Sequence, residues 1–348
     1  MKKIKIGNRV IGDGEPCFIV AEVSANHQQK FGHAVNIIKA AAEAGADAVK
    51  LQTYTPDTIT IDSDKKWFWV GGKNNPKVWK GKTFYDLYKD AYTPWAWHAE
   101  LKDIANDHGM ILFSTPFDST AVDFLEKLKV PCYKIASYEA TDIPLLRKVA
   151  STKKPVIMSV GFATLGEIEL SVSTLKSHGA KDIVVLQCTT SYSDTPKADA
   201  TNLRTMHDIR ERFNVLSGFS DNMGGVEVPA LAAALGAAVV EKHIVVKHDK
   251  RILDDRYSLD KECLKKKLQK IRWQEAVAGH VKYGPQTEAE EYNRQFRRSL
   301  FVVRGIKKGE RLTKENIRSI RPAYGLETKF FDVILGKIAT KDIESGTP

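Results

Sequence analysis

Residues 34–52 read AVNIIKAAAEAGADAVKLQ and hold one complete helix–turn–strand unit. Apolar side chains three and four positions apart predict a helix over Ala34–Ala44. The apolar run at Asp47–Gln52 shows little polar alternation, as in a parallel strand that is buried on both faces. Lys50 lies inside this run, and a buried ammonium group is costly unless it is paired or used. The unit therefore predicts an element of an α/β fold together with a first functional residue.

The same unit recurs along the chain, because apolar runs rich in Val, Ile and Phe alternate with helix-length segments. Eight such units favour a (β/α)8 TIM barrel. A doubly wound sheet is the alternative, but no G-x-G-x-x-G opens the first strand–helix turn. The predicted strands are Cys17–Glu22, Asp47–Gln52, Met110–Ser114, Cys132–Ala136, Pro155–Val160, Asp182–Cys188, Val215–Ser220 and Ala238–His243. The predicted helices include Ala34–Ala44, Trp97–His108, Ala121–Leu128, Leu165–His178, Val228–Leu235 and Leu259–Ala278.

The composition is globular, since 43% of the 348 residues are hydrophobic and 28% are charged. No apolar run reaches the roughly 18 to 20 residues of a membrane span, and the basic N-terminus lacks the apolar segment of a signal peptide. Four widely spaced cysteines without C-x-x-C spacing argue against a zinc ribbon or a disulfide framework. We therefore expect a cytoplasmic protein with no membrane partner.

The net charge of +10 is compatible with nucleic acid or with an anionic small molecule. No basic run interleaved with aromatics and no RNA-binding signature is present in the sequence. We expect no nucleic-acid partner and favour an anionic substrate.

The sequence changes character after the last predicted helix. A polar segment with a Glu-Ala-Glu-Glu cluster predicts a linker over 281–295, after a barrel domain over 1–280. Short strand-like runs at Ser299–Val303 and Ile317–Ile320, separated by glycine and proline, predict a small β-rich domain over 296–348. This domain is too small to hold an active site alone.

Polar side chains gather at the carboxyl ends of the predicted strands, where a barrel places its active site. Lys50 and Lys134 together with strand-end hydroxyls would form a cradle for a phosphate or a carboxylate. A Schiff base on a barrel lysine is the alternative use. Glu22 is a candidate general base or a group that positions water, and its structural alternative is a salt bridge to one of these lysines.

The last strands supply candidate metal ligands. His243 ends the eighth predicted strand, and Asp221 and Asn222 follow the seventh. Oxygen donors of this kind suit Mn²⁺ or Mg²⁺ better than a structural zinc site. The simpler interpretation of His243 is a hydrogen-bonded structural residue.

Several ordered motifs resemble the sialic acid synthase family over essentially the whole chain. They are EVSANH at 22–27, AGADAVKLQT at 44–53, FSTPF at 113–117, YKIASYE at 133–139, GFSD at 218–221, VEKH at 240–243, RRSL at 297–300 and RP at 321–322. The final segment resembles the family's antifreeze-like (SAF) domain. Further matches, to the pseudaminic acid synthase branch, are QTYTPD at 52–57, TPWAWH at 93–98, YSLD at 257–260 and RPAYGL at 321–326.

The resemblance implies a metal-dependent condensation of phosphoenolpyruvate with an open-chain N-acetylated amino sugar, which gives a nine-carbon 2-keto acid and phosphate. It implies that Glu22 manages the attacking water and that a domain-swapped homodimer brings Arg321 to the partner's substrate. The residues expected to bind phosphoenolpyruvate are Lys50, Thr115, Lys134, Ser137 and Ser220, with Tyr192 close by. Glu139 and Asp254 are expected to bind sugar hydroxyls, and Gln52 is expected among the substrate-binding residues. His243 is expected to bind Mn²⁺, with Mg²⁺ or Co²⁺ as alternatives.

One position departs from the family pattern. The family's Ser-Asp-His turn, whose histidine is the second metal ligand, reads Ser220-Asp221-Asn222 in this chain. An amide oxygen is a weaker ligand than imidazole for a borderline transition metal. We therefore expect a weaker metal site, or one shifted toward harder ions. The alternatives are an N-acetylneuraminate or legionaminate synthase, a Schiff-base aldolase or other barrel lyase, and a sugar-binding homologue without activity.

Overall fold

The computed structural model describes residues 2–71, 79–190, 198–223, 225 and 227–348. The chain divides into two compact units, Met1–Gly279 and His280–Pro348. Each unit is described below by itself.

The first unit is a closed barrel of eight parallel strands with the neighbour order β10-β3-β4-β5-β6-β7-β8-β9. The barrel closes between the last strand and the first, where His243 lies beside Glu22. All eight predicted strands are present, so the (β/α)8 prediction is confirmed. The strands are β3 (Phe18–Glu22), β4 (Ala48–Thr53), β5 (Ile111–Pro116), β6 (Tyr133–Ile135), β7 (Val156–Ser159), β8 (Ile183–Thr189), β9 (Leu216–Asp221) and β10 (Val239–His243).

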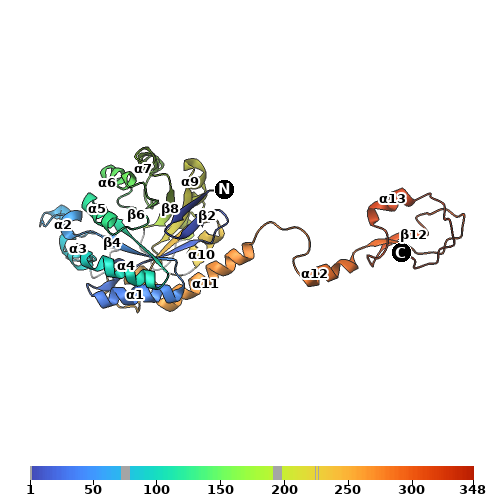
Figure 1. The fold of residues 1–348 in the computed structure, drawn as a ribbon, viewed down its shortest axis with the longest axis horizontal. Coiled ribbons are helices and arrows are strands. Elements are labelled where there is room, and N and C mark those ends of the chain that lie inside the picture. Colours follow the sequence, from blue (N-terminus) through green and yellow to red (C-terminus); the bar gives the residue numbers. More distant parts are fainter. Residues whose placement is uncertain (1, 72–78, 191–197, 224, 226) are drawn as a thin grey trace. The chain divides into compact units, whose positions relative to one another are not determined.

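Helices surround the strands of this unit (Figure 1). Their buried faces repeat every three or four residues, as the sequence pattern predicts. The longer ones are α1 (Phe31–Ala44), α4 (His98–Asp107), α5 (Ser119–Lys127), α6 (Ile143–Ser151), α7 (Leu165–Ser177), α9 (Thr205–Phe213), α10 (Glu227–Ala234) and α11 (Lys261–Ala278). Helix α3 (Phe84–Ala91) has eight residues, as α10 does, and α2 (Pro56–Ile59) and α8 (Ala198–Thr201) are single turns. No helix in the described part of the chain has the length and hydrophobicity needed to cross a membrane.

An N-terminal hairpin, which sequence reasoning missed, precedes the barrel. It pairs β1 (Lys3–Ile6) with β2 (Arg9–Gly12) in antiparallel register. Its apolar side chains belong to the same core cluster as Phe18 and Ile111 at the amino ends of their strands. The hairpin therefore packs at the end of the barrel opposite the polar strand ends.

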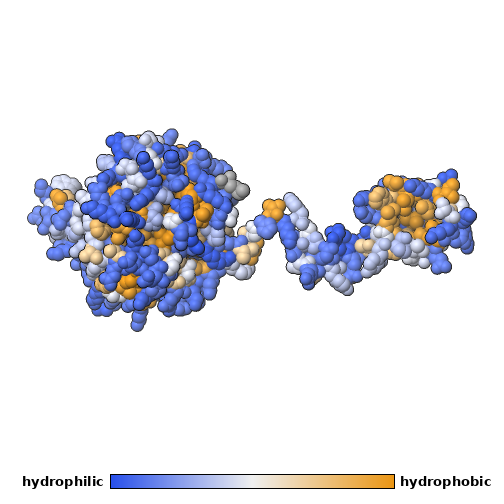
Figure 2. Space-filling view, viewed as in Figure 1, coloured by the Kyte–Doolittle hydropathy of each residue, from blue (hydrophilic) through white to orange (hydrophobic). Residues whose placement is uncertain are grey.

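The second unit has its own small core, built from Leu300, Val302, Ile306, Ile317 and Ala339. The antiparallel strands β11 (Ser299–Val302) and β12 (Ile317–Ile320) match the two predicted there. The helices α12 (Glu288–Asn293) and α13 (Phe331–Ile334) complete it. Figure 2 shows apolar surface gathered on one face of this unit. Its exposed apolar side chains include Tyr324, Leu326, Val333 and Ile338.

Candidate active site

A cavity of about 560 Å³ opens at the carboxyl ends of the barrel strands. Parallel strands place their last residues at one end of a barrel, so side chains far apart in sequence converge there. The structure brings ten of the predicted site residues to the lining of this cavity: Glu22, Lys50, Gln52, Lys134, Ser137, Glu139, Ser220, Asn222, His243 and Asp254.

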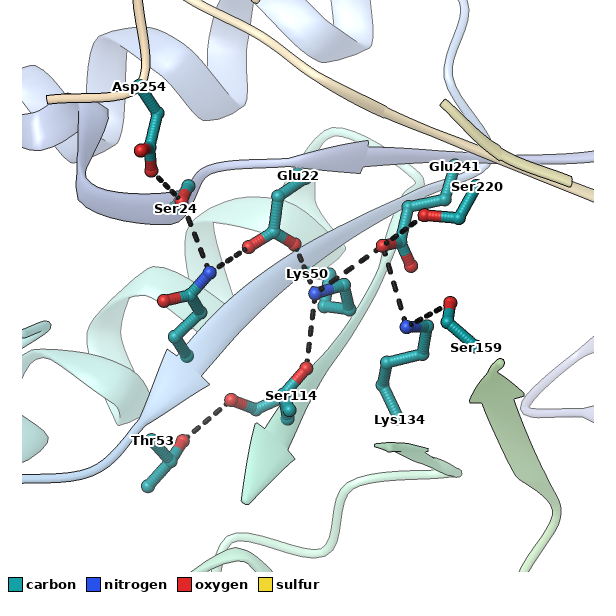
Figure 3. Close-up of polar contacts among 12 residues, drawn as sticks. Glu22, Ser24, Lys50, Thr53, Ser114, Lys134, Ser159, Ser220, Glu241 and Asp254 are labelled. Atoms are coloured by element: carbon teal, nitrogen blue, oxygen red, sulfur yellow. Dashed lines mark hydrogen bonds and ion pairs between the residues drawn. The ribbon is translucent and has the colours of Figure 1, made fainter. Parts of the chain in front are cut away.

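Two lysines and two glutamates form the floor of the cavity (Figure 3). The Lys50 Nζ lies 2.5 Å from Glu22 Oε2 and 3.7 Å from Glu241 Oε1. The Lys134 Nζ lies 3.7 Å from the same Glu241 oxygen. Because all four side chains are buried, these pairs offset part of the cost of removing the charges from water. We call this group, Glu22, Lys50, Lys134 and Glu241, the polar floor.

Hydroxyl groups hold the two ammonium groups in place. Lys50 donates to Thr115 Oγ1 at 3.1 Å, and Lys134 donates to Ser159 Oγ at 2.8 Å. Ser220 donates to Glu241 at 3.4 Å, and Ser137 accepts a hydrogen bond from the Gly161 amide at 3.2 Å. Thr115 thus acts on the floor through Lys50, from just behind the cavity lining.

A second chain of hydrogen bonds leads from the floor to Asp254. Gln52 donates from Nε2 to Glu22 Oε1 at 2.9 Å and to Ser24 Oγ at 3.1 Å. Ser24 donates in turn to Asp254, whose other oxygen accepts from Tyr257 at 2.9 Å. Burial raises the pKa of the Asp254 carboxyl despite these hydrogen bonds. The network therefore fixes one carboxyl group and one amide at the side of the cavity.

The pKa values of Glu22, Lys50 and Lys134 are shifted. Burial raises the pKa of Glu22, and the charge of Lys50 opposes this rise without cancelling it. Burial also lowers the pKa of Lys134. For Lys50, the attraction of Glu22 and Glu241 outweighs burial, so its pKa rises. The two lysines therefore differ: Lys50 holds its proton firmly and Lys134 holds it less firmly.

Glu139 follows strand β6 and lines the cavity near the floor. Burial raises its pKa to about 7, against the opposing pull of the nearby Lys134. Its Oε2 atom is buried and has no hydrogen-bond partner among the described residues. The carboxyl group is thus available to a hydroxyl-bearing ligand and titrates near neutral pH.

His243 and Asn222 offer ligand atoms to a metal ion. The buried Nδ1 of His243 has no hydrogen-bond partner in the described parts of the chain. Burial and three nearby lysines hold the pKa of this imidazole well below its usual range, so a lone pair is free. Asn222 donates its amide hydrogen to Cys188 Sγ at 3.4 Å, which leaves its carbonyl oxygen for a ligand role. The donor set therefore fits a divalent cation, although no group of three His, Cys, Asp or Glu side chains within the described ranges is placed to hold one.

A buried ionic cluster supports the Asn222 turn from behind. Asp221 pairs with Lys242 at 3.2 Å and with Lys267 of α11 at 3.1 Å. Lys242 also donates to the Met223 and Asp221 carbonyls. Burial lowers the pKa of Lys267 to about 7. These contacts fix the backbone on both sides of Asn222.

One wall of the cavity is apolar. Phe84, Leu87, Tyr88 and Ala91 of α3 all line it. We call these four side chains the apolar wall.

Two predicted site residues do not join the others in this unit. Tyr192 lies outside the described residues. Arg321 belongs to the second unit, where its side chain is exposed.

Sequence reasoning missed Glu241, Ser159 and the apolar wall. Strand alternation provided a signal for Glu241, because residues two apart on a strand share a face and His243 was already a candidate. Thr83 followed by apolar residues at helical spacing provided a signal for α3.

A closed (β/α)8 barrel with a charged cavity at the carboxyl ends of its strands defines a class of barrel enzymes. The chain belongs to the NeuB family, the sialic acid synthase family: the NeuB family model matches residues 37–283, and the SAF domain model matches residues 297–348. The expected SAF domain is thereby confirmed.

Similar proteins agree with this assignment. A pseudaminic acid synthase of Campylobacter jejuni is 40% identical over 99% of this chain and 97% of its own length. An N,N'-diacetyllegionaminic acid synthase of Legionella pneumophila is 33% identical over 97% of this chain and 94% of its own. The crystal structure of an N-acetylneuraminic acid synthetase from Leptospira borgpetersenii, in complex with citrate, superposes with a TM-score of 0.72 at 31% identity. It covers 84% of this chain and 96% of its own.

Proposed function

We propose that this enzyme condenses phosphoenolpyruvate with an open-chain 2,4-diacetamido-2,4,6-trideoxy hexose. The products are a nine-carbon 2-keto sugar acid and inorganic phosphate. The similarity to pseudaminic acid synthases supports the choice of sugar. The observation that carries the proposal is the polar floor, where two buried lysines share Glu241 in one cavity.

The floor suits a small and highly charged anion. Phosphoenolpyruvate carries a carboxylate and a phosphate, and each would gain a charge-assisted hydrogen bond from Lys50 or Lys134. Ser159 accepts a hydrogen bond from Lys134, and the hydroxyls of Ser137 and Ser220 line the same cavity. A bound anion would pair with the two ammonium groups, which pair with Glu22 and Glu241 in this structure.

The reaction forms one carbon–carbon bond and breaks one carbon–oxygen bond. The C3 carbon of the enol phosphate attacks the sugar aldehyde, and the aldehyde oxygen takes up a proton to become a hydroxyl. Water then adds to C2 and the phosphate leaves with the bridging oxygen, which restores a ketone at C2. We assign Glu22 to accept a proton from this water, because its carboxylate lines the cavity beside Lys50 and burial raises its pKa.

His243 and Asn222 would hold a divalent cation, with Mn²⁺ favoured over Mg²⁺ and Co²⁺. Such an ion supplies Lewis-acid polarisation of the aldehyde oxygen. The unpartnered Nδ1 of His243 supports this assignment.

We assign the sugar hydroxyls to Glu139 and Asp254 at the side of the cavity, with Gln52 between Asp254 and the floor. Tyr192 is proposed to lie near phosphoenolpyruvate. The enzyme is proposed to work as a domain-swapped homodimer in which Arg321 reaches the partner's sugar. The exposed Arg321 and the exposed apolar side chains of the SAF domain support this arrangement. The four free cysteines support a cytoplasmic location.

Phosphate release from phosphoenolpyruvate tests the proposal. The full-length protein is assayed with 2-acetamido and 2,4-diacetamido hexoses, with and without a chelator, and the product mass is recorded. We expect phosphate and a nine-carbon 2-keto acid in equal amounts, and loss of both with the chelator. Sugar binding without phosphate release under any added metal would identify a non-catalytic homologue instead.

The lowered pKa of Lys134 favours a second candidate, a Schiff-base aldolase. Borohydride reduction in the presence of a 2-keto acid separates the two functions. The aldolase would gain a covalent adduct on Lys134, whereas the synthase would remain unmodified.

A further inference from the structure

Helix α3 presents its apolar stripe to the cavity. Phe84, Leu87, Tyr88 and Ala91 are spaced i, i+3, i+4 and i+7, which places them on one helix face. All four line the cavity, while the charged residues Asp86, Lys89 and Asp90 are exposed. A helix of the barrel's outer layer normally turns such a stripe onto the protein core. In α3 the stripe forms part of the wall of a binding site.

Helix α3, which carries this wall, lies in the long connection between β4 and α4, of which residues 54–71 and 79–97 are described. Thr83 caps α3 by accepting a hydrogen bond from the Asp86 amide at 3.1 Å. Tyr54 at the start of the connection contacts Tyr88 edge-on, with ring centroids 5.6 Å apart, and Phe117 at 5.0 Å. These aromatic contacts fix the wall without using hydrogen bonds.

The wall and the floor favour different parts of a ligand. The floor gains from an anion, whereas apolar side chains that face a water-filled cavity gain only when apolar ligand surface covers them. A ligand that satisfies both carries charge at one end and unsubstituted hydrocarbon at the other. Phosphoenolpyruvate supplies the charge, so the hydrocarbon must come from the acceptor sugar.

We propose that the apolar wall of α3 is the specificity-determining surface of this enzyme and binds the methyl end of the acceptor sugar. This inference rests on the proposed function, in which the sugar ends in a 6-deoxy carbon. A 6-hydroxyl in the same place would lose its water partners against Leu87 and Phe84. An apolar pocket discriminates against an added hydroxyl by about 10- to 100-fold in kcat/KM.

Two sugars that differ only at C6 test the proposal. We use the 2,4-diacetamido-2,4,6-trideoxy hexose and its 6-hydroxy counterpart, and measure kcat/KM for each with phosphoenolpyruvate saturating. The wild type should prefer the deoxy sugar by at least tenfold. Leu87→Asn, which keeps the branching of the side chain but replaces its methyl groups by an amide, should lower this ratio at least tenfold, mainly through the sugar KM. Phe84→Tyr places a hydroxyl on the same wall and should lower it in the same direction.

Controls separate specificity from folding. Leu170→Asn makes the same exchange on the outer surface of α7, where Leu170 is 54% exposed, and should leave the activity unchanged. Leu87→Met stays apolar and should keep the sugar preference within about threefold. The KM for phosphoenolpyruvate should stay within about threefold in each variant. If Leu87→Asn fails to fold, Phe84→Tyr decides.

The outcomes distinguish this inference from the proposed function. Phosphate release with both sugars at equal efficiency in the wild type, or an unchanged ratio in the folded variants, overturns the assignment of the wall and leaves the condensation intact. Absence of phosphate release with every N-acetylated sugar overturns the proposed function itself.

Discussion

The floor and the wall of the cavity are built on different principles. The polar floor comes from four strands. Its first and last members, Glu22 and Glu241, lie near opposite ends of the barrel sequence, yet both are within ion-pair distance of Lys50. The apolar wall comes from one eight-residue helix whose members are neighbours in sequence. The floor is thus set by the closure of the barrel, whereas the wall is set by one helix in the connection between β4 and α4.

This difference suggests how the two surfaces divide the chemistry. The floor residues are ion-paired across four barrel strands, so replacing one of them disturbs the others. The floor therefore suits the substrate that would be common to every reaction, phosphoenolpyruvate. A change in α3 leaves the barrel unaltered, so the wall suits recognition of a variable substrate. Floor variants should affect phosphoenolpyruvate with every sugar, whereas wall variants should change the choice of sugar.

The largest effect is expected from Lys134→Met. This variant removes an ammonium group that donates to Ser159 and pairs with Glu241, and it leaves the carboxylate of Glu241 with one cation fewer. Loss of one member of a buried charged set costs about 2 to 5 kcal/mol, so kcat/KM for phosphoenolpyruvate should fall by roughly 1000-fold. Steady-state phosphate release measures this with two different sugars. The matched control is Lys148→Met on α6, where the half-buried Lys148 pairs with Asp123 outside the cavity, and an equal loss in both variants would falsify this division between floor and wall.

Glu22→Gln should have the next largest effect. The amide keeps the shape of the side chain but accepts no proton, and general-base catalysis contributes about 10²- to 10⁴-fold. We expect kcat to fall by roughly 100-fold while the KM for phosphoenolpyruvate changes little. Pre-steady-state phosphate release measures the step directly. A loss confined to KM would show instead that Glu22 only orients Lys50.

Much of this architecture could be predicted from the sequence because burial leaves a strong pattern. The eight strands are apolar runs, and Lys50 and Lys134 are conspicuous as charges inside them. Barrel topology then brings distant strand ends together without further information. The β1–β2 hairpin has only a short alternating pattern, so it was missed.

The apolar wall could not be assigned to the site for a different reason. The stripe of α3 has the spacing of any core-facing helix, and nothing in that spacing tells whether the stripe meets the core or a cavity. Glu241 shows the opposite case, since its place two residues before His243 on a strand indicates a shared face. The hydrogen bond that Asn222 donates to Cys188 joins residues far apart in the sequence, so only the folded structure reveals it.

Asn222→His tests the proposed metal site beside the polar floor. If Asn222 and His243 hold the metal, replacing an amide oxygen by an imidazole should tighten Mn²⁺ binding by roughly 10-fold or more. Calorimetric titration of the metal-free protein with Mn²⁺ and Mg²⁺ measures this without catalysis. The wild type should favour Mg²⁺ relative to the variant. Nanomolar Mn²⁺ binding by the wild type would contradict the weak site, and His243→Ala should abolish the difference.

The smallest effect is expected from the titration of Glu139. Because burial raises its pKa to about 7, the carboxylate that would accept sugar hydroxyls is lost as the pH falls from 8 to 6. The value of kcat/KM for the sugar should drop by roughly three- to tenfold over this range, and Glu139→Gln should flatten that profile while leaving the KM for phosphoenolpyruvate unchanged.

The raised pKa of Glu139 also affects stability: the free energy of unfolding falls as the pH rises, whereas kcat/KM for the sugar rises. The folded state binds this proton more tightly than the unfolded chain, whose glutamate has a pKa near 4.5. The unfolding free energy contributed by Glu139 is therefore full below pH 4.5 and declines as the pH rises toward 7. Denaturant unfolding of the wild type and Glu139→Gln at pH 5 and pH 8 measures this, and the wild type should lose more stability between the two. An identical loss in both proteins would show that the raised pKa of Glu139 does not contribute to the pH dependence of stability.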